Sequence, residues 1–182
     1  MIRTIGMIEL NSIARGIQTA DVMIKAAEVD LILAKTICPG KYIVLITGNV
    51  GAVKAAVESG RQIGEEYVVD TLLLPNVEEQ VIPAINQSSG ITKLKDLGVM
   101  EFFSVTAAVV AADAAAKSAD VQLIEVRLGM GIGGKSFVTL TGDVSAVKNA
   151  VTVGTNTALK SGMLVNKAVI SGPSKELLQY LL

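Results

Sequence analysis

The stretch G-K-Y-I-V-L-I-T-G-N-V-G-A-V-K-A-A-V-E-S-G at residues 40–60 recurs as G-K-S-F-V-T-L-T-G-D-V-S-A-V-K-N-A-V-T-V-G at residues 134–154. Twelve of the 21 aligned positions are identical. Residues 5–35 align in the same way with residues 97–127, with ten of 31 positions identical. Because similarity repeated at a fixed spacing marks repeated structural units, we interpret the chain as two copies of one domain.

The boundary between the two copies falls in a polar segment, A-I-N-Q-S-S-G-I-T-K-L-K, at residues 84–95. A polar segment that contains Gly and Ser is typical of a linker. We therefore predict a first domain over residues 1–90 and a second domain over residues 91–182.

Both copies show the same predicted order of secondary structure. The predicted elements of the first copy are a strand at 4–10, a helix from 13, strands at 29–35 and 42–47, a helix after 49, a strand at 68–74 and a short helix from about 78. The second copy ends in the same way, with a strand at 164–170 and a helix at 175–182. The order β-α-β-β-α-β is typical of the ferredoxin-like arrangement, an α/β fold of the α+β type with one sheet and helices on one of its faces.

Two features of each copy predict where its helices begin. Ser12 can cap the first helix, and Asn49, which is Asp143 in the second copy, can cap the second helix. The first helix is also indicated by apolar residues at helical spacing, namely Ile13, Ile17, Ala20, Ile24 and Ala27.

The composition excludes several classes of function. The 182 residues contain 16 Lys and Arg against 17 Asp and Glu, so a net charge of −1 offers no basic surface for nucleic acid. The chain has no His, which excludes Ser-His and Cys-His nucleophiles and His-ligated zinc sites. The acids Glu9/Glu101 and Asp21/Asp113 recur in both copies, and catalysis seldom needs each site twice. We assign these acids structural roles and predict that the protein is not an enzyme.

The chain is apolar without a segment that could cross a membrane. Hydrophobic residues make up 51% of it, and its mean hydropathy is +0.54. The longest uncharged stretch, residues 42–53, has 12 residues, whereas a spanning helix needs about 20. Charged residues at Arg3 and Glu9 argue against a signal peptide, and a single Cys suits the reducing cytoplasm. We expect a soluble, cytoplasmic protein that buries its apolar surplus between subunits.

Several motifs resemble those of bacterial microcompartment shell proteins. They are I-G-M-I-E-L at 5–10, A-D-V-M-I-K-A-A at 20–27, the Pro-Gly-Lys turn at 39–41 and T-G-N-V-G-A-V at 47–53, with weaker echoes in the second copy. The resemblance covers nearly the whole chain, twice. The run K-T-I-C-P-G-K at 35–41 is most similar to the tandem-domain PduT type of the propanediol-utilization compartment.

The resemblance implies an assembly as well as a fold. It implies a homotrimer whose six domains imitate a hexamer, and which tiles with other shell proteins of the same compartment into a wall around metabolic enzymes. In this family the Lys of the D-x-M-x-K helix lies at the tile edge, which implies that role for Lys25 and, at the matching position of the second copy, for Lys117. Without the resemblance, we would expect both lysines to be ordinary solvent-exposed side chains.

The resemblance also implies that two turns surround a central pore. The first is the turn of Cys38, and its pore-lining residues are Thr36, Ile37, Pro39 and Gly40. The second turn contributes Gly129, Met130, Gly131, Ile132, Gly133 and Gly134.

The second turn also fits the phosphate-binding pattern G-x-x-x-x-G-K-[ST], with Lys135 and Ser136 at its end. That pattern binds phosphate only where a helix follows, because the amides and dipole of the helix N-terminus hold the anion. The β-rich run S-F-V-T-L-T follows here instead. We therefore prefer a flexible glycine turn to a nucleotide-binding site.

Cys38 is the candidate metal ligand. A lone Cys is usually a small buried hydrophobic residue, but Cys38 precedes Pro-Gly in a turn between two predicted strands. If this turn surrounds a threefold axis, three chains present three thiols at one point, and soft thiolates suit an iron–sulfur cluster rather than Mg²⁺ or Ca²⁺.

The PduT-type resemblance implies a [4Fe–4S] cluster shared by three subunits through Cys38. The expected function is then a shell tile that moves electrons across the compartment wall, with an internal redox enzyme as a further expected partner. The alternative is a purely structural or pore-forming tile without a cluster.

Overall fold

The computed structural model describes residues 4–181, which form two compact units that divide in sequence between Val77 and Glu78. The elements of the first unit are β1 (Thr4–Leu10), α1 (Ile13–Ala26), β2 (Val29–Ile37), β3 (Lys41–Gly48), α2 (Val50–Gly64), the 3₁₀ helix η1 (Glu65–Tyr67) and β4 (Val68–Leu74). The elements of the second unit are α3 (Val81–Ile85), β5 (Asp96–Phe102), α4 (Val105–Ser118), β6 (Val121–Leu128), β7 (Ser136–Gly142), α5 (Val144–Lys160), β8 (Leu164–Ile170) and α6 (Lys175–Leu181).

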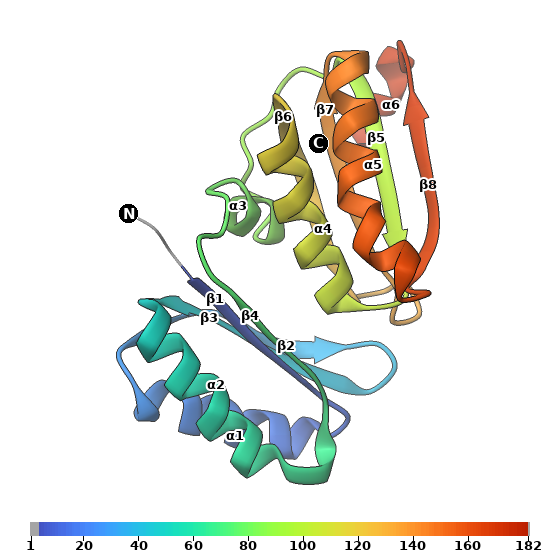
Figure 1. The fold of residues 1–182 in the computed structure, drawn as a ribbon. Helices are drawn as coiled ribbons and strands as arrows, with labels where there is room; N and C mark the ends of the chain where they lie inside the picture. The colour runs from blue at the N-terminus through green and yellow to red at the C-terminus, as the bar shows by residue number, and fades with distance from the viewer. Residues whose placement is uncertain (1–3, 182) are drawn as a thin grey trace. The chain divides into compact units, whose positions relative to one another are not determined.

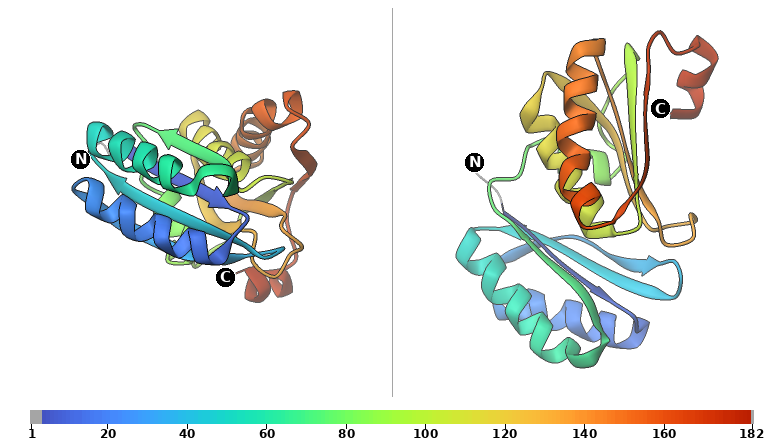
Figure 2. Two further views of the ribbon diagram at one scale, coloured as in Figure 1. Left: turned by 90° about the horizontal axis from the view of Figure 1, so that it is seen from below. Right: turned by 45° about the vertical axis from the view of Figure 1, so that its right-hand side comes forward.

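Each unit is built on one four-stranded antiparallel sheet. The strand order is β2-β3-β1-β4 in the first unit and β6-β7-β5-β8 in the second. Figure 1 shows α1 and α2 on one face of the first sheet, and α4 and α5 on one face of the second. Figure 2 shows the same layering from two other directions. The predicted fold of two tandem β-α-β-β-α-β domains is confirmed.

All four long helices begin where the sequence predicts, but only α1 and α4 have the predicted side-chain cap. The Ser12 hydroxyl accepts from Arg15 N at 3.3 Å, and the Ser104 hydroxyl accepts from Ala107 N at 3.2 Å. Asn49 and Asp143 stand at the predicted cap positions, but neither side chain bonds to its helix. The Asp143 carboxylate is instead bound by the Lys95 ammonium at 3.0 Å.

The apolar spacing of α1 predicts the helix correctly but does not identify its buried face. Ile13, Ile17 and Ile24 are 42%, 56% and 42% exposed. The buried face instead carries Gly16, Thr19, Ala20 and Met23. A Cβ at Gly16 would lie 2.5 Å from the Cβ of Tyr42 on β3, so α1 lies against the sheet there and its large isoleucines face outward.

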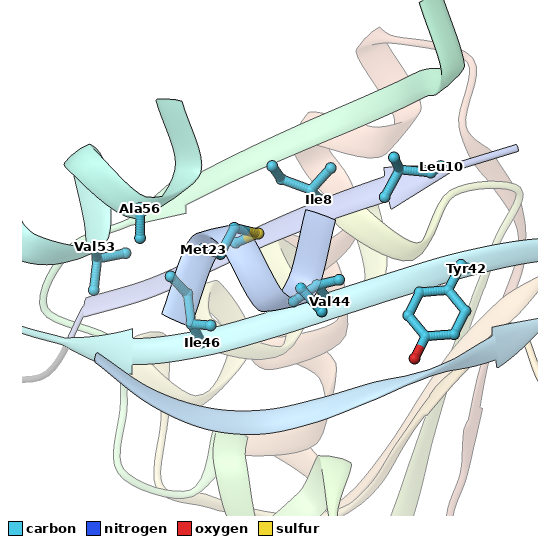
Figure 3. Close-up of a cluster of buried hydrophobic side chains, with 9 residues drawn as sticks. Ile8, Leu10, Met23, Tyr42, Val44, Ile46, Val53 and Ala56 are labelled. Carbon is cyan, nitrogen blue, oxygen red and sulfur yellow. The ribbon is translucent and has the colours of Figure 1, made fainter. Parts of the chain in front are cut away.

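The core of the first unit lies between its helix layer and its sheet. Figure 3 shows side chains of β1 and β3 meeting those of α1 and α2. The cluster consists of Ile8, Leu10, Ala20, Met23, Tyr42, Val44, Ile46, Val53 and Ala56. Alternate residues of β1 and β3 point into it, as expected for strands that bury one face under helices.

Helices α4 and α5 of the second unit approach each other closely at Gly154. A Cβ at this position would lie 2.8 Å from Met100 Sδ and 2.9 Å from the backbone oxygen of Ala111 on α4. At Gly51, near the start of α2, a Cβ would meet nothing within 4 Å. Gly154 is therefore fixed by packing, and Gly51 is not.

We expect Gly154→Ala to lower the free energy of unfolding by about 1–3 kcal/mol, because the carbonyl of Ala111 cannot move aside without separating α4 from α5. Gly51→Ala should raise that free energy by up to about 0.5 kcal/mol, because Ala favours the helix over Gly but residue 51 lies in the first turn of α2. Chemical denaturation at one protein concentration measures both changes. Equal stability of the two variants would show that the helices of the second unit are not closely packed at residue 154.

Candidate functional site

The first candidate pore turn is shorter than the sequence predicts. β2 continues through Thr36 and Ile37, so the turn itself is Cys38, Pro39 and Gly40. Ile37 is buried at 4% exposure, whereas Cys38 is half-buried and Pro39 and Gly40 are exposed. The peptide between Cys38 and Pro39 is cis. The buried isoleucine thus holds the end of the strand and leaves the cysteine at the turn.

The second candidate pore turn joins β6 to β7. Its four glycines, Gly129, Gly131, Gly133 and Gly134, all have φ between 65° and 81°, a conformation that other residues rarely adopt. Gly129 is buried, Met130 is 38% exposed, and Ile132 is half-buried. The glycines are therefore required by the path of the backbone.

The geometry after the second turn does not suit phosphate binding. β7 begins at Ser136, so a strand follows Lys135 in place of the helix that the phosphate-binding pattern requires. The ammonium group of Lys135 is engaged by the Glu101 carboxylate. The match to the phosphate-binding pattern is thus explained by a strand–turn–strand connection.

A Lys–Glu pair stands at the base of each turn. Lys41 Nζ lies 2.7 Å from Glu9 Oε1, and Lys135 pairs with Glu101 at the equivalent place in the second unit. Glu9 is only 5% exposed in its side chain, whereas Glu101 is 32% exposed. The recurring glutamates therefore have the structural role that the sequence predicts. Their lysine partners were not predicted, although the Gly-Lys pair that recurs at 40–41 and 134–135 was the signal.

Lys41→Met is expected to lower the free energy of unfolding by about 3 kcal/mol, because it leaves the buried Glu9 carboxylate without a counter-charge. Lys135→Met is the matched control. Glu101 retains contact with water, so Lys135→Met should lower the free energy of unfolding by less than about 1 kcal/mol. Urea titrations of both variants provide the comparison, and equal losses would contradict the structural role given to the first pair.

Lys35 lies three residues before Cys38 on β2. Its side chain is partly buried, and this burial lowers the pKa of its ammonium group. The strand that leads to the cysteine therefore carries a positive charge that is partly withdrawn from water.

The two candidate tile-edge lysines have different surroundings. Lys25 Nζ is 2.7 Å from Asp21 Oδ2, and these side chains are 72% and 60% exposed. Lys117 makes the same pair with Asp113 at 2.8 Å, but their side chains are only 37% and 9% exposed. Asp113 is covered because its other oxygen accepts from the backbone N of Glu78 at 2.8 Å. Lys25 is thus the more accessible of the two lysines.

The donor set of one chain cannot hold a metal cluster by itself. Cys38 is the single thiol of the sequence, and among residues 4–181 no three His, Cys, Asp or Glu side chains gather into a metal site. A half-buried thiol at a turn is accessible to ligands from outside the chain. The residues present therefore fit an iron–sulfur cluster only where several copies each contribute Cys38.

A scan against protein families finds the BMC domain twice, at residues 4–77 and 96–173. The bacterial microcompartment shell protein PduT of Citrobacter freundii is 42% identical over 97% of this chain and 96% of its own length. The carboxysome assembly protein CcmO of a Synechocystis strain is 30% identical over 88% of this chain and 58% of its own.

Among solved structures, a crystal structure of a microcompartment protein from Desulfitobacterium hafniense matches with a TM-score of 0.95 and 52% identity. It covers 98% of this chain and 99% of that one. No helix within residues 4–181 has the length and apolar character needed to span a bilayer.

Proposed function

Because the chain belongs to the BMC-domain family of bacterial microcompartment shell proteins, which are structural rather than catalytic, we propose that three copies form one tile of six domains that holds a [4Fe–4S] cluster at its centre. Cys38 of each copy supplies one ligand. Such a tile lies in the compartment wall beside other shell proteins and moves electrons across it, with a redox enzyme inside the compartment as the partner.

The position of Cys38 is the main support for this proposal. It is the only thiol of the chain, and it stands at the strand–turn–strand connection that recurs in both units. If three chains are related by a threefold axis at this turn, their three thiols come together as soft ligands at a single point. The match to PduT over almost the full length of both chains supports the assignment to this type of shell protein.

The apolar outer surface supports assembly into a tile. The first unit exposes the isoleucines of α1, together with Val50 at 55% and Leu31 at 45% exposure. Monomeric proteins rarely expose large apolar areas, and such areas mark interfaces. The surplus of apolar residues in the composition is thus located on surfaces that neighbouring subunits can cover.

The residues around Cys38 give the turn its shape. Ile37 anchors the strand end in the core, Gly40 adopts φ 71° to turn the chain back, and the Lys41–Glu9 pair fixes the start of β3. These contacts hold the thiol at the end of a fixed hairpin. The cluster supplies one-electron transfer when bound.

A tile without a cluster is the second candidate function. The second turn favours it, because a run of glycines with positive φ could shape an opening without any metal. In that case Cys38 is incidental, and the tile serves as wall or as metabolite pore.

Two measurements test the proposal in its two parts. Light scattering on the purified protein should give the mass of three chains, and a single-chain mass would reject the tile. Purification without oxygen in the presence of iron and sulfide should give the absorption and EPR spectra of an iron–sulfur cluster. Spectra without these features in a three-chain assembly would favour the tile without a cluster.

A further inference from the structure

The short helix α3 closes the exposed edge of a sheet. It follows β4 of the first unit in sequence but packs in the second unit, on the edge strand β6. Gln80 accepts from the backbone N of Leu123 at 2.9 Å and donates to the oxygen of Val121 at 3.2 Å. Val81 and Ala84 of α3 are fully buried. A helix thereby satisfies and covers an edge that would otherwise be open to pairing.

The C-terminal helix α6 is the repeat equivalent of α3. A shift of 96 residues places β4 on β8, as their pairing with β1 and β5 shows. The turn that follows is also the same, because Asn76 and Gly172 have φ of 53° and 59°. The backbone bond from Val81 N to Glu78 O, 3.0 Å, recurs from Leu177 N to Ser174 O at 3.1 Å.

Unlike α3, α6 is not packed closely on a strand within residues 4–181. Within residues 4–181 it packs closely on no other helix or strand, and Figure 2 shows it away from α4 and α5. Tyr180, the equivalent of the buried Ala84, is 80% exposed. Tyr180 and Leu181 line a cavity of about 670 Å³ that separates them from Ile124 and Arg127 of β6. In the described part of the chain, α6 is therefore a formed helix without a closely packed partner.

The strand β2 is the repeat equivalent of β6 and is uncovered. Both are edge strands, and both carry a bulge at the same place, after Leu31 and after Leu123. Leu31 is 45% exposed, whereas Leu123 under α3 is 1% exposed. The Asp21 side chain is 60% exposed, whereas that of Asp113, bound by the segment before α3, is 9% exposed. The first unit thus presents the surface that α3 covers in the second.

We propose that α6 of each chain docks on β2 of a second copy, and so reproduces between chains the contact that α3 makes with β6. The inference rests on the three-chain tile proposed above. Each chain then offers one helix and receives one helix, a heterologous contact that closes into a ring when the last chain reaches the first. Leu177, Tyr180 and Leu181 cover Leu31, and the backbone N of Ser174 binds Asp21 of the neighbour.

One residue of this contact differs between the two copies. Gln80, which both donates and accepts, corresponds to Glu176, which can accept from Leu31 N but cannot donate to Val29 O. Glu176→Gln should therefore add a hydrogen bond at each contact and lower the dissociation constant of the assembly by about three- to tenfold. An unchanged or higher dissociation constant would count against the proposed register.

Disulfide crosslinking tests the docking itself. Chains with Glu176→Cys and chains with Leu31→Cys, both in a Cys38→Ser background, are produced together and mildly oxidised. The expected product is a covalent dimer on a non-reducing gel, which neither chain gives alone. The control pairs Glu176→Cys with Val50→Cys, an exposed position on α2, and should give no excess of dimer.

Light scattering of the same samples distinguishes failure of the docking from failure of the three-chain tile. A three-chain assembly without the dimer from the Leu31 pair would overturn the docking and leave the tile intact. Placing both cysteines on one chain and finding only an intrachain disulfide would also overturn it, because α6 would then reach β2 of its own chain. A single-chain mass would overturn both the docking and the tile.

Discussion

Cys38→Ser is expected to remove all the iron from the protein purified without oxygen, from about four iron atoms for every three chains to none. A serine hydroxyl is a harder and far less acidic donor than a thiol, and the chain has no second cysteine to replace it. Iron and sulfide assays, with EPR spectra of the reduced protein, measure the loss. The number of chains in the assembly should not change, because the side chain at residue 38 is at a turn and not in the core.

The matched control for this substitution is Ile132→Ser, which changes the residue at the corresponding place in the second turn. It alters the same part of the fold without touching a thiol, so iron and EPR signals should stay at the level of the unmodified protein. Iron that persists in Cys38→Ser, or that disappears equally in Ile132→Ser, would contradict ligation by Cys38.

Lys25→Ala is expected to abolish extended sheets while leaving the individual tile intact. The Lys25 side chain is 72% exposed and its ion pair with Asp21 is open to water, so the loss of protein stability should stay within about 0.5 kcal/mol. If the ammonium group lies at the tile edge, its removal takes away a contact at every junction between tiles. Electron microscopy of concentrated protein shows the sheets, and light scattering shows the tiles.

Lys54→Ala, which removes an exposed lysine from α2, is the control for the edge prediction. Sheets should form normally in this variant. If Lys25→Ala assembles as well as Lys54→Ala, the edge role of Lys25 is wrong, although the tile could still form.

The repeated sequence predicts most of the fold because glycine and the β-branched residues fix local geometry. The Gly-Lys turns, the serine caps of α1 and α4, and the order of helices and strands along the chain all follow from residues that act over short distances. The place where α3 packs could not be predicted in this way. Its packing on β6 depends on contacts with a strand some 40 residues further along the chain, which local patterns do not record.

The outward face of α1 shows a second limit of the sequence pattern. Apolar spacing identifies a helix, but it does not distinguish a face that packs within one chain from a face that another chain covers. Ile13, Ile17 and Ile24 satisfy the pattern and are exposed, while Gly16 and Met23 contact the core. An assembly that buries both faces places apolar residues all around the helix, so its pattern alone is ambiguous.

The sequence predicts those features of the candidate site that a single chain contains. The two turns follow from the repeat, and the structure places Cys38 at the first of them. The Glu9–Lys41 pair beneath it was not predicted, because its partners are 32 residues apart and meet only through the pairing of β1 with β3. The cluster depends on copies that the sequence of one chain does not describe.

Native mass spectrometry of protein purified without oxygen tests most directly whether three chains share one inorganic centre. We expect a species with the mass of three 18.9 kDa chains plus one [4Fe–4S] cluster, and three Cys38→Ser chains without the cluster. Three chains without added inorganic mass, or single chains, would contradict it.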